Sequence, residues 1–211
     1  MRKLSSTLMV LLIFGQLFAQ SDQFSVVTYP DQLKRSLNQM SAATSSIQAD
    51  FVQEKYMEIL SSKLISQGTI TFKKPNMLRW EYMEPFSYVV ILNNNKMLIR
   101  DDKKTNTIDM ASSKTFQEIN QLIIGIIQGS VLDNPQFDIQ YFESPGNYKV
   151  KLNSTNKEMK AIINSIEIIF DKREFLVDRI KLLEPGGDFT NIFFKNRRLN
   201  QPVEDAAFSI H

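Results

Sequence analysis

The chain has no cysteine, and its one histidine is His211. Without cysteine there is no thiol nucleophile and no thiolate metal site. A residue at the end of a chain is usually frayed, so we expect no catalytic role for His211 and no Ser-His-Asp, Cys-His or two-histidine zinc site. Glycine is also scarce, with seven residues, and Gly186-Gly187 stands alone between two predicted strands rather than in a phosphate-binding loop. We therefore predict no enzymatic activity, no cofactor and no metal site.

Long hydrophobic runs are scarce as well, and the one near the N-terminus covers only residues 8–18. Two basic residues precede it and the small Ala19 follows it, which gives the three parts of a secretory signal. The run is too short for a helix that crosses the hydrocarbon core of a membrane, which is about 30 Å thick. We predict a cleaved signal peptide at 1–19 and an exported chain at 20–211, with an uncleaved membrane anchor as the alternative. With no cysteine at the cleavage point, lipid attachment there is excluded.

Charge of one sign is not in excess, since 25 Lys and Arg residues face 23 Asp and Glu residues. Removal of the signal peptide takes away Arg2 and Lys3 and leaves 23 residues of each sign. Proteins that bind nucleic acids depend on an excess of Lys and Arg. The sequence therefore predicts that nucleic acid is not a partner.

Phenylalanine is abundant, with 15 residues, and much of the chain alternates between apolar and polar residues as β-strands do. In the first alternating segment, Ile47, Ala49 and Phe51 share one face. Turn residues such as Asn93-Asn94-Asn95 separate the segments, because Asn tolerates positive φ angles. The predicted strands are 46–58, 63–73, 77–82, 87–92, 96–100, 105–109, 137–142, 148–152, 159–171, 175–183, 189–195 and 207–210.

One domain with a large antiparallel sheet follows from this organisation, since no linker, repeat or low-complexity tract divides the chain. A helix precedes the sheet, where Asp31 can act as the N-cap and Leu33 and Leu37 recur at helical spacing. A sheet of about ten to eleven strands twists strongly. We therefore predict an α+β fold, mainly antiparallel β, in which a curved, open half-barrel is covered by a few helices.

The helix predicted at 115–128 is unusually apolar. Phe116, Ile119 and Ile123 fall on one stripe, and further apolar residues widen it. Either the helix plugs the sheet and completes a dry core, or it is a lid over a cavity that accepts an apolar ligand. Periodicity does not distinguish filled space from empty space, so both interpretations stay open here.

Three short features point to one family. A strand containing Gly68 enters the turn Lys74-Pro75-Asn76, and Trp80 follows on the next strand. Residues 47–53 end in Phe-x-Gln, and Pro85 comes after the Trp strand. These features resemble the periplasmic outer-membrane lipoprotein carriers, the LolA-like family. The order of elements is similar over the whole mature chain.

This resemblance implies a half-barrel with lid helices and an apolar cavity for acyl chains. It also implies a periplasmic carrier of acylated lipoproteins or other lipids, which receives its cargo from an inner-membrane lipoprotein-releasing ABC transporter and delivers it to an outer-membrane receptor. We expect the carrier to be a monomer. Asn93-Asn94-Asn95 and Met97-Leu98-Ile99 depart from the family's usual turn and aromatic strand, which leaves the identity of the lipid open.

Several residues can be carried over from the family to this chain. Lys74 occupies the position where well-known members have an Arg that hydrogen-bonds lid-helix carbonyls, and we expect it to be the lid latch. Lysine lacks the planar fork of arginine, so this latch is expected to be weaker. The predicted cavity lining consists of Ile47, Phe51, Phe72, Leu78, Trp80, Tyr82, Phe116, Ile119 and Ile123, of which Phe72 and Tyr82 rest on alternation alone.

Two rival functions stay open. One is an envelope sensor or structural interaction protein that uses the same fold without transport. The other is a periplasmic hydrolase, because a carboxylate pair such as one used in glycoside hydrolysis meets only in the fold. Its candidate carboxylates lie on predicted strands, namely Glu54, Glu58, Glu81 and Glu167.

Overall fold

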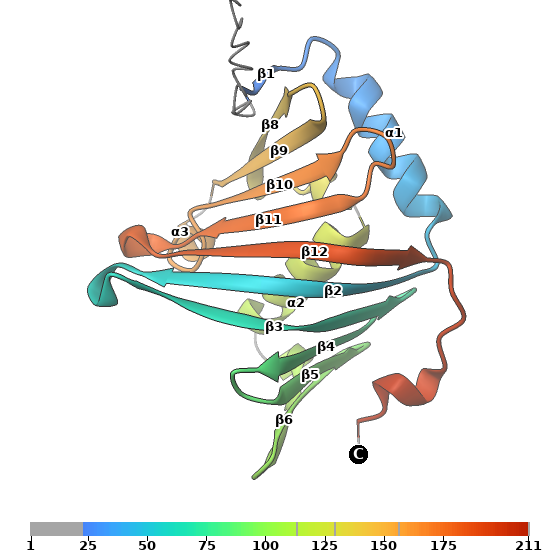
Figure 1. Ribbon diagram of the computed structural model, residues 1–211, viewed down its shortest axis with the longest axis vertical. Helices are drawn as coiled ribbons and strands as arrows, with labels where there is room; N and C mark the ends of the chain where they lie inside the picture. The colour runs from blue at the N-terminus through green and yellow to red at the C-terminus, as the bar shows by residue number, and fades with distance from the viewer. Residues whose placement is uncertain (1–22, 113, 129, 156, 211) are drawn as a thin grey trace, which may run out of the picture.

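The body of the molecule is one curved antiparallel sheet (Figure 1). The structure is a computed structural model that describes residues 23–112, 114–128, 130–155 and 157–210, with only the backbone described at 114–116, 119, 120, 128, 130 and 133. The strands are β1 (Ser25–Val26), β2 (Ser46–Met57), β3 (Ser62–Lys73), β4 (Met77–Glu84), β5 (Tyr88–Asn93), β6 (Lys96–Asp101), β7 (Thr105–Asp109), β8 (Phe137–Glu143), β9 (Asn147–Ser154), β10 (Ser165–Asp171), β11 (Val177–Leu183) and β12 (Phe189–Leu199). The predicted signal peptide at 1–19 lies outside the described residues.

The strands follow the order β1-β8-β9-β10-β11-β12-β2-β3-β4-β5-β6-β7. Neighbours in this order are antiparallel, and the last strand, β12, pairs with β2, the first long strand. Within the described residues, the edge strands β1 and β7 pair only with β8 and β6, so the sheet is open. The predicted open antiparallel half-barrel is confirmed, but the sheet has 12 strands rather than ten to eleven. The two-residue β1 is too short to leave any periodicity in the sequence.

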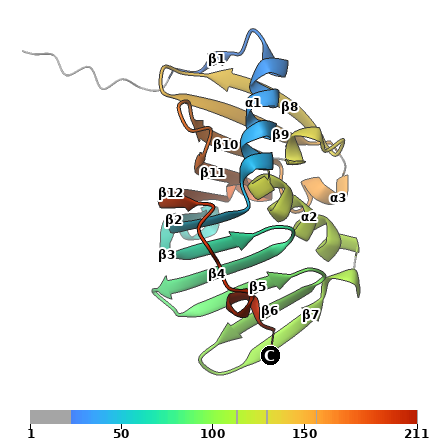
Figure 2. The same cartoon turned by 90° about the vertical axis from the view of Figure 1, so that its right-hand side faces the viewer.

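Two long helices lie against one face of this sheet (Figures 1 and 2). The helices are α1 (Pro30–Ala43), α2 (Lys114–Gln128) and the short α3 (Lys157–Lys160), with single 3-10 turns η1 (Glu58–Leu60), η2 (Met110–Ser112), η3 (Ser130–Asp133), η4 (Pro185–Gly187) and η5 (Asp205–Phe208). In α1, Leu33 and Leu37 are buried as their spacing predicted. The prediction that Asp31 caps α1 was wrong. Tyr29 is the N-cap, without a side-chain hydrogen bond, and Asp31 lies in the first turn, where its charge favours the helix dipole.

One of the predicted strands was wrong in part, and another was wrong altogether. The segment predicted as strand 159–171 begins with α3, and β10 starts only at Ser165. The segment 207–210 is not a strand. It belongs to η5 and its continuation, whose Phe208 packs with Val89, Ile91 and Leu98. In both places a few apolar residues pack onto the sheet, and such short segments carry no distinguishing periodicity.

The C-terminal segment explains the continuous apolar run of β5. Val89 and Ile91 pack against Phe208, whereas Val90 and Leu92 line the opposite face, under α2. A strand covered on both faces loses its apolar–polar alternation. The turn after β5 is confirmed as predicted, since Asn94 has a φ angle of 53°.

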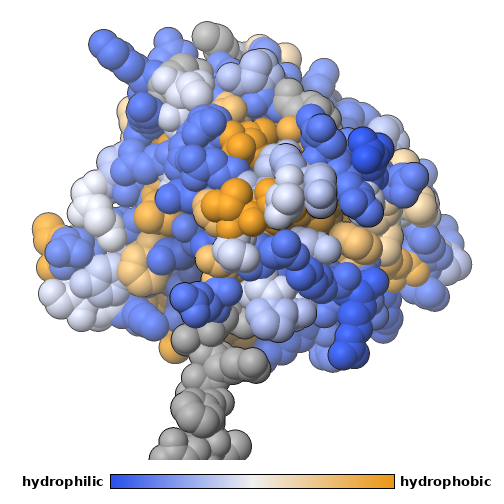
Figure 3. Space-filling model, turned by 90° about the horizontal axis from the view of Figure 1, so that it is seen from above, coloured by the Kyte–Doolittle hydropathy of each residue, from blue (hydrophilic) through white to orange (hydrophobic). Residues whose placement is uncertain are grey.

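The surface is mainly hydrophilic when the molecule is viewed from above, with hydrophobic patches between the hydrophilic side chains (Figure 3). None of the helices in the described part of the chain has the length and hydropathy that a membrane crossing requires.

Candidate functional site

A large apolar cavity lies between the concave face of the sheet and α2. We call it the sheet–α2 cavity. Its volume is about 410 Å³, within the range of roughly 300–1,000 Å³ typical of ligand sites. The walls come from β2–β6, β11 and β12 on the sheet side, and from α2 and the segment around α3 on the other. In the structure this helix therefore borders a cavity, and whether it acts as a lid stays a prediction.

A smaller cavity of about 90 Å³ lies between the sheet and α1, and we call it the sheet–α1 cavity. Leu37 and Met40 of α1 form part of its wall, together with residues of the β10–β11 connection. The two cavities share the side chains of Ile70, Ile126, Ile127, Ile180 and Phe194. One layer of side chains therefore separates them.

Six of the nine predicted lining residues lie in these walls. The sheet–α2 cavity contains Leu78, Trp80, Tyr82 and Ile123, and the sheet–α1 cavity contains Ile47 and Phe72. Phe51 is not in either wall. It is 1 % exposed and makes edge contacts with Trp80 and Tyr82, whose ring centroids lie 5.2 and 5.0 Å from its own. Phe116 and Ile119 belong to α2, but their side chains lie outside the described part of the chain.

Polar side chains gather at one end of the sheet–α2 cavity. They are Gln53 near the end of β2, Tyr82 near the end of β4, Tyr88 at the start of β5, and Thr190 near the start of β12. In this antiparallel sheet these strand ends lie next to one another, on the side of the sheet where the β2–β3 hairpin turns. The opposite end of the cavity is apolar, with Leu78, Leu92 and Met97 in its wall.

The polar end contains a defined hydrogen bond and a stacked pair. The Tyr82 hydroxyl donates to Gln53 Oε1 at 2.9 Å, and the rings of Tyr82 and Tyr88 stack with centroids 4.2 Å apart. Burial is the main cause that raises the pKa of the Tyr82 phenol, and the neighbouring Tyr88 raises it further. Burial also raises the pKa of Tyr88. Both groups therefore stay protonated and neutral at neutral pH.

Trp80 stands next to this pair and is held by aromatic contacts on several sides. Its ring centroid lies 6.4 Å from those of Tyr82 and Phe194. The indole Nε1 is buried and has no hydrogen-bond partner among the described residues. Buried polar groups usually have a partner, so this unpaired indole nitrogen is an exception.

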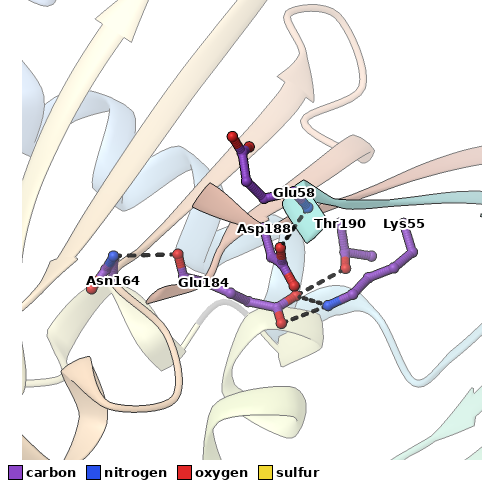
Figure 4. A network of polar contacts seen from close by, with 6 residues as sticks. All are labelled: Lys55, Glu58, Asn164, Glu184, Asp188 and Thr190. Carbon is purple, nitrogen blue, oxygen red and sulfur yellow. Dashed lines mark hydrogen bonds and ion pairs between the residues drawn. The ribbon is translucent and has the colours of Figure 1, made fainter. Parts of the chain in front are cut away.

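A network of polar contacts lies next to Thr190, at the same strand ends (Figure 4). Lys55 Nζ lies 2.6 Å from both carboxylate oxygens of Glu184, and Thr190 Oγ1 donates to the same carboxylate at 3.1 Å. The backbone N–H of Glu58 donates to Asp188 Oδ1 at 2.9 Å. These contacts connect the end of β2 to the β11–β12 connection. They therefore hold together the strand ends that carry the polar end of the cavity.

Lys74 lies at the opposite ends of the strands, directly after β3, and it contacts the C-terminal end of α1. Its Nζ donates to the carbonyl oxygens of Ser41 and Ala42 at 2.8 and 3.0 Å. Asn200 Nδ2 donates to the next carbonyl, of Ala43, at 3.2 Å. The last carbonyls of a helix have no partner within it, so side chains from two other segments satisfy those of α1. Lys74 thus contacts α1 rather than α2.

The candidate carboxylates of a hydrolase do not meet in a cavity. Glu54 pairs with Lys63 and Glu81 pairs with Arg79, and none of the four predicted candidates is in the wall of either cavity. Among the described residues, no group of three or more His, Cys, Asp and Glu side chains is arranged to hold a metal ion.

Sequence reasoning missed several residues of the two walls. Gln53 and Tyr88 could have been found, because Gln53 continues the inward alternation of Ile47 and Tyr88 pairs with Tyr82 across the hairpin. Phe175 and Leu176 carry no such indication. They lie in a turn, where Phe175 has a φ angle of 56°.

The family profile described as "Outer membrane lipoprotein carrier protein LolA" matches residues 42–211. An outer-membrane lipoprotein carrier protein of Pseudomonas putida (strain W619) is 27 % identical over 180 residues, which cover 84 % of this chain and 82 % of the relative. A protein of the same description from Pseudoalteromonas translucida (strain TAC 125) is 22 % identical and covers 99 % and 92 %. Among solved structures, an uncharacterized conserved protein from Thermus thermophilus has a TM-score of 0.52 at 10 % identity, covering 86 % of this chain and 94 % of that one, which supports the fold alone.

Proposed function

The chain belongs to the LolA family of outer membrane lipoprotein carrier proteins, and on that premise we propose that it binds the acyl chains of lipoproteins or related lipids between its sheet and helices. It carries them through the periplasm from the inner to the outer membrane. The signal sequence, the donor ABC transporter, the outer-membrane receptor and the monomeric state are parts of this proposal.

The sheet–α2 cavity is the observation that carries the proposal. Its wall is apolar except at one end, and its volume of about 410 Å³ suits hydrocarbon. Burial of each CH₂ group is worth about 0.8 kcal/mol, so acyl chains need such a shield in water. Binding that depends on burial alone is reversible, which suits a carrier that releases its cargo without covalent chemistry.

Lys74 is proposed as a latch on α1. It holds the end of the helix that covers the sheet–α1 cavity, while α2 covers the larger cavity. Opening of α1 would extend the apolar space beyond the shared layer of side chains. The latch therefore acts at the sheet–α1 cavity and does not alter the polar end of the sheet–α2 cavity.

The test is displacement of a bound apolar fluorophore by a triacylated lipopeptide and by the same peptide without acyl chains. We expect displacement by the acylated form alone. Ile123→Glu places a charge in the cavity wall and is expected to abolish this binding with the fold retained, because burial of an unpaired carboxylate is strongly unfavourable. Gln121→Glu is the matched control, since Gln121 is exposed on the same helix. Wild-type binding by Ile123→Glu would refute the cavity assignment.

An interaction protein without transport is the second candidate, and a separate observation favours it. Large apolar side chains are exposed on the β2–β3 hairpin and in the β4–β5 connection, including Ile59 at 90 % and Phe86 at 74 %. Exposed apolar groups of this kind often mark contact surfaces. If neither peptide displaces the fluorophore, or none is taken up, the cavity is not a lipid site and this second function replaces the first.

A further inference from the structure

Phe194 of β12 lies at the boundary between the two cavities. Thr190 and Ile192, earlier on the same strand, line the sheet–α2 cavity. Arg197 and Leu199, later on the strand, line the sheet–α1 cavity. Phe194 lies between these two pairs and lines both cavities. The wall that β12 contributes therefore changes from one cavity to the other at this side chain.

The packing of Phe194 agrees with this position. The core contains one apolar cluster around Ile166 and Ile168 and a second around Ile70 and Leu78. Phe194 packs against both clusters, and no other described residue belongs to both. Its ring is only half-buried, so part of its surface stays accessible from the cavities that it lines. Phe194 is therefore a divider between two apolar spaces.

The neighbouring strand β2 has the same boundary at the position that pairs with Phe194. This position is Phe51, which is 1 % exposed and is in neither wall. On one side of it Gln53 lines the sheet–α2 cavity, and on the other side Ala49 lines the sheet–α1 cavity. Phe51 thus fills the surface of the sheet at the boundary, and Phe194 supplies a side chain that separates the two spaces.

We propose that Phe194 limits the length of the acyl chain that the protein binds best. This inference rests on the proposed function and deepens it, because it defines the cargo as acyl chains short enough to end at this ring. At a rise of about 3.4 Å per residue, Phe194 lies roughly 14 Å along β12 from Thr190. A chain that lies along β12 in the sheet–α2 cavity is limited to this length. A longer chain has to bend or leave its last CH₂ groups in water.

The experiment measures displacement of the apolar fluorophore from the full mature protein by one peptide that carries a single acyl chain, from octanoyl to stearoyl. Burial of each further CH₂ group is expected to raise the affinity roughly fourfold. In the wild type we expect this increase to stop within the series, at the chain that reaches Phe194. The chain length at which the increase stops is the readout.

Three variants test the divider. Phe194→Ala removes the ring and joins the two cavities, so we expect the increase to continue to longer chains. The stearoyl peptide should then bind roughly 15 times more tightly than to the wild type, the gain from two further buried CH₂ groups. Phe194→Leu is expected to give a smaller shift and keeps the test decisive if Phe194→Ala does not fold. Ile192→Ala is the matched control, because Ile192 lines the sheet–α2 cavity on the same strand. It should change the affinities without moving the length at which the increase stops.

The outcomes separate the two proposals. If the increase stops at the same chain length in the wild type and in both Phe194 variants, the divider is overturned and the carrier function stands. The same holds if Ile192→Ala moves this length as far as Phe194→Ala does, or if the wild type shows no limit within the series. If no acylated peptide of the series and no triacylated lipopeptide displaces the fluorophore, the carrier function fails and the divider fails with it.

Discussion

Replacement of Lys74 by methionine tests whether this residue holds α1 against the sheet. The variant keeps most of the side-chain length and loses two charged hydrogen bonds, to the carbonyls of Ser41 and Ala42. A hydrogen bond to a charged group contributes about 1.5–3 kcal/mol, and a cation at a helix C-terminus about 0.3–1 kcal/mol. Water can reach the exposed Ala42 carbonyl in the variant and offsets part of this loss. We therefore expect local opening of α1 to become easier by about 1–2 kcal/mol.

Amide hydrogen exchange measures this opening directly. A change of about 1–2 kcal/mol corresponds to exchange roughly 5–30 times faster, and we expect it for the amides of α1, including that of Leu37. Lys73→Met is the matched control. The neighbouring Lys73 donates to Val203 O and Asp205 at 2.7 and 2.5 Å, so its loss frees the C-terminal segment and not α1. Lys74→Arg retains donors and is expected to restore slow exchange. Unchanged α1 exchange in Lys74→Met, or an equal increase in Lys73→Met, would refute the latch.

Two further predictions concern stability. Gly68→Ala is expected to lower the free energy of unfolding by at least about 1–3 kcal/mol in urea titrations, because the added Cβ would lie 1.9 Å from the carbonyl oxygen of Glu81. Gly146→Ala, whose Cβ meets nothing within 4 Å, should change little, and equal effects would contradict the close strand approach. Because burial raises the pKa of Tyr82 above its usual value near 10, its stabilising contribution is complete below that pH and is lost as pH rises through the folded-state pKa. Wild type should therefore lose more stability than Tyr82→Phe between pH 8 and 10.5, and parallel losses would show that the phenol does not contribute.

The sheet was predictable because its strands are long and their turns have distinctive residues. Ile47, Ala49 and Phe51 alternate along a strand that runs from Ser46 to Met57 in the structure, and Asn94 supplies the positive φ angle of the β5–β6 turn. Alternation also placed Leu78, Trp80 and Tyr82 on the face that lines the cavity. These inferences need only neighbours along one strand.

The failures share a different cause. Met159 lies in a helix of four residues, and Phe208 in a 3-10 turn of four residues, which is too short for either period to appear. Their apolar character reflects packing onto a sheet that the local sequence does not reveal. The hydrogen bond from Tyr82 to Gln53 likewise joins residues that are 29 positions apart and depends on the register of three strands.

The cavity itself could not be read from the sequence, because the same apolar residues could fill space as well as enclose it. Space that side chains leave unfilled is nevertheless costly, because the atoms that line it lose packing contacts on one side. A sequence with 15 phenylalanines has the bulk to close such a space. The space stays open while Phe51 and Phe72 are 1 % exposed, and this supports the ligand site that we propose.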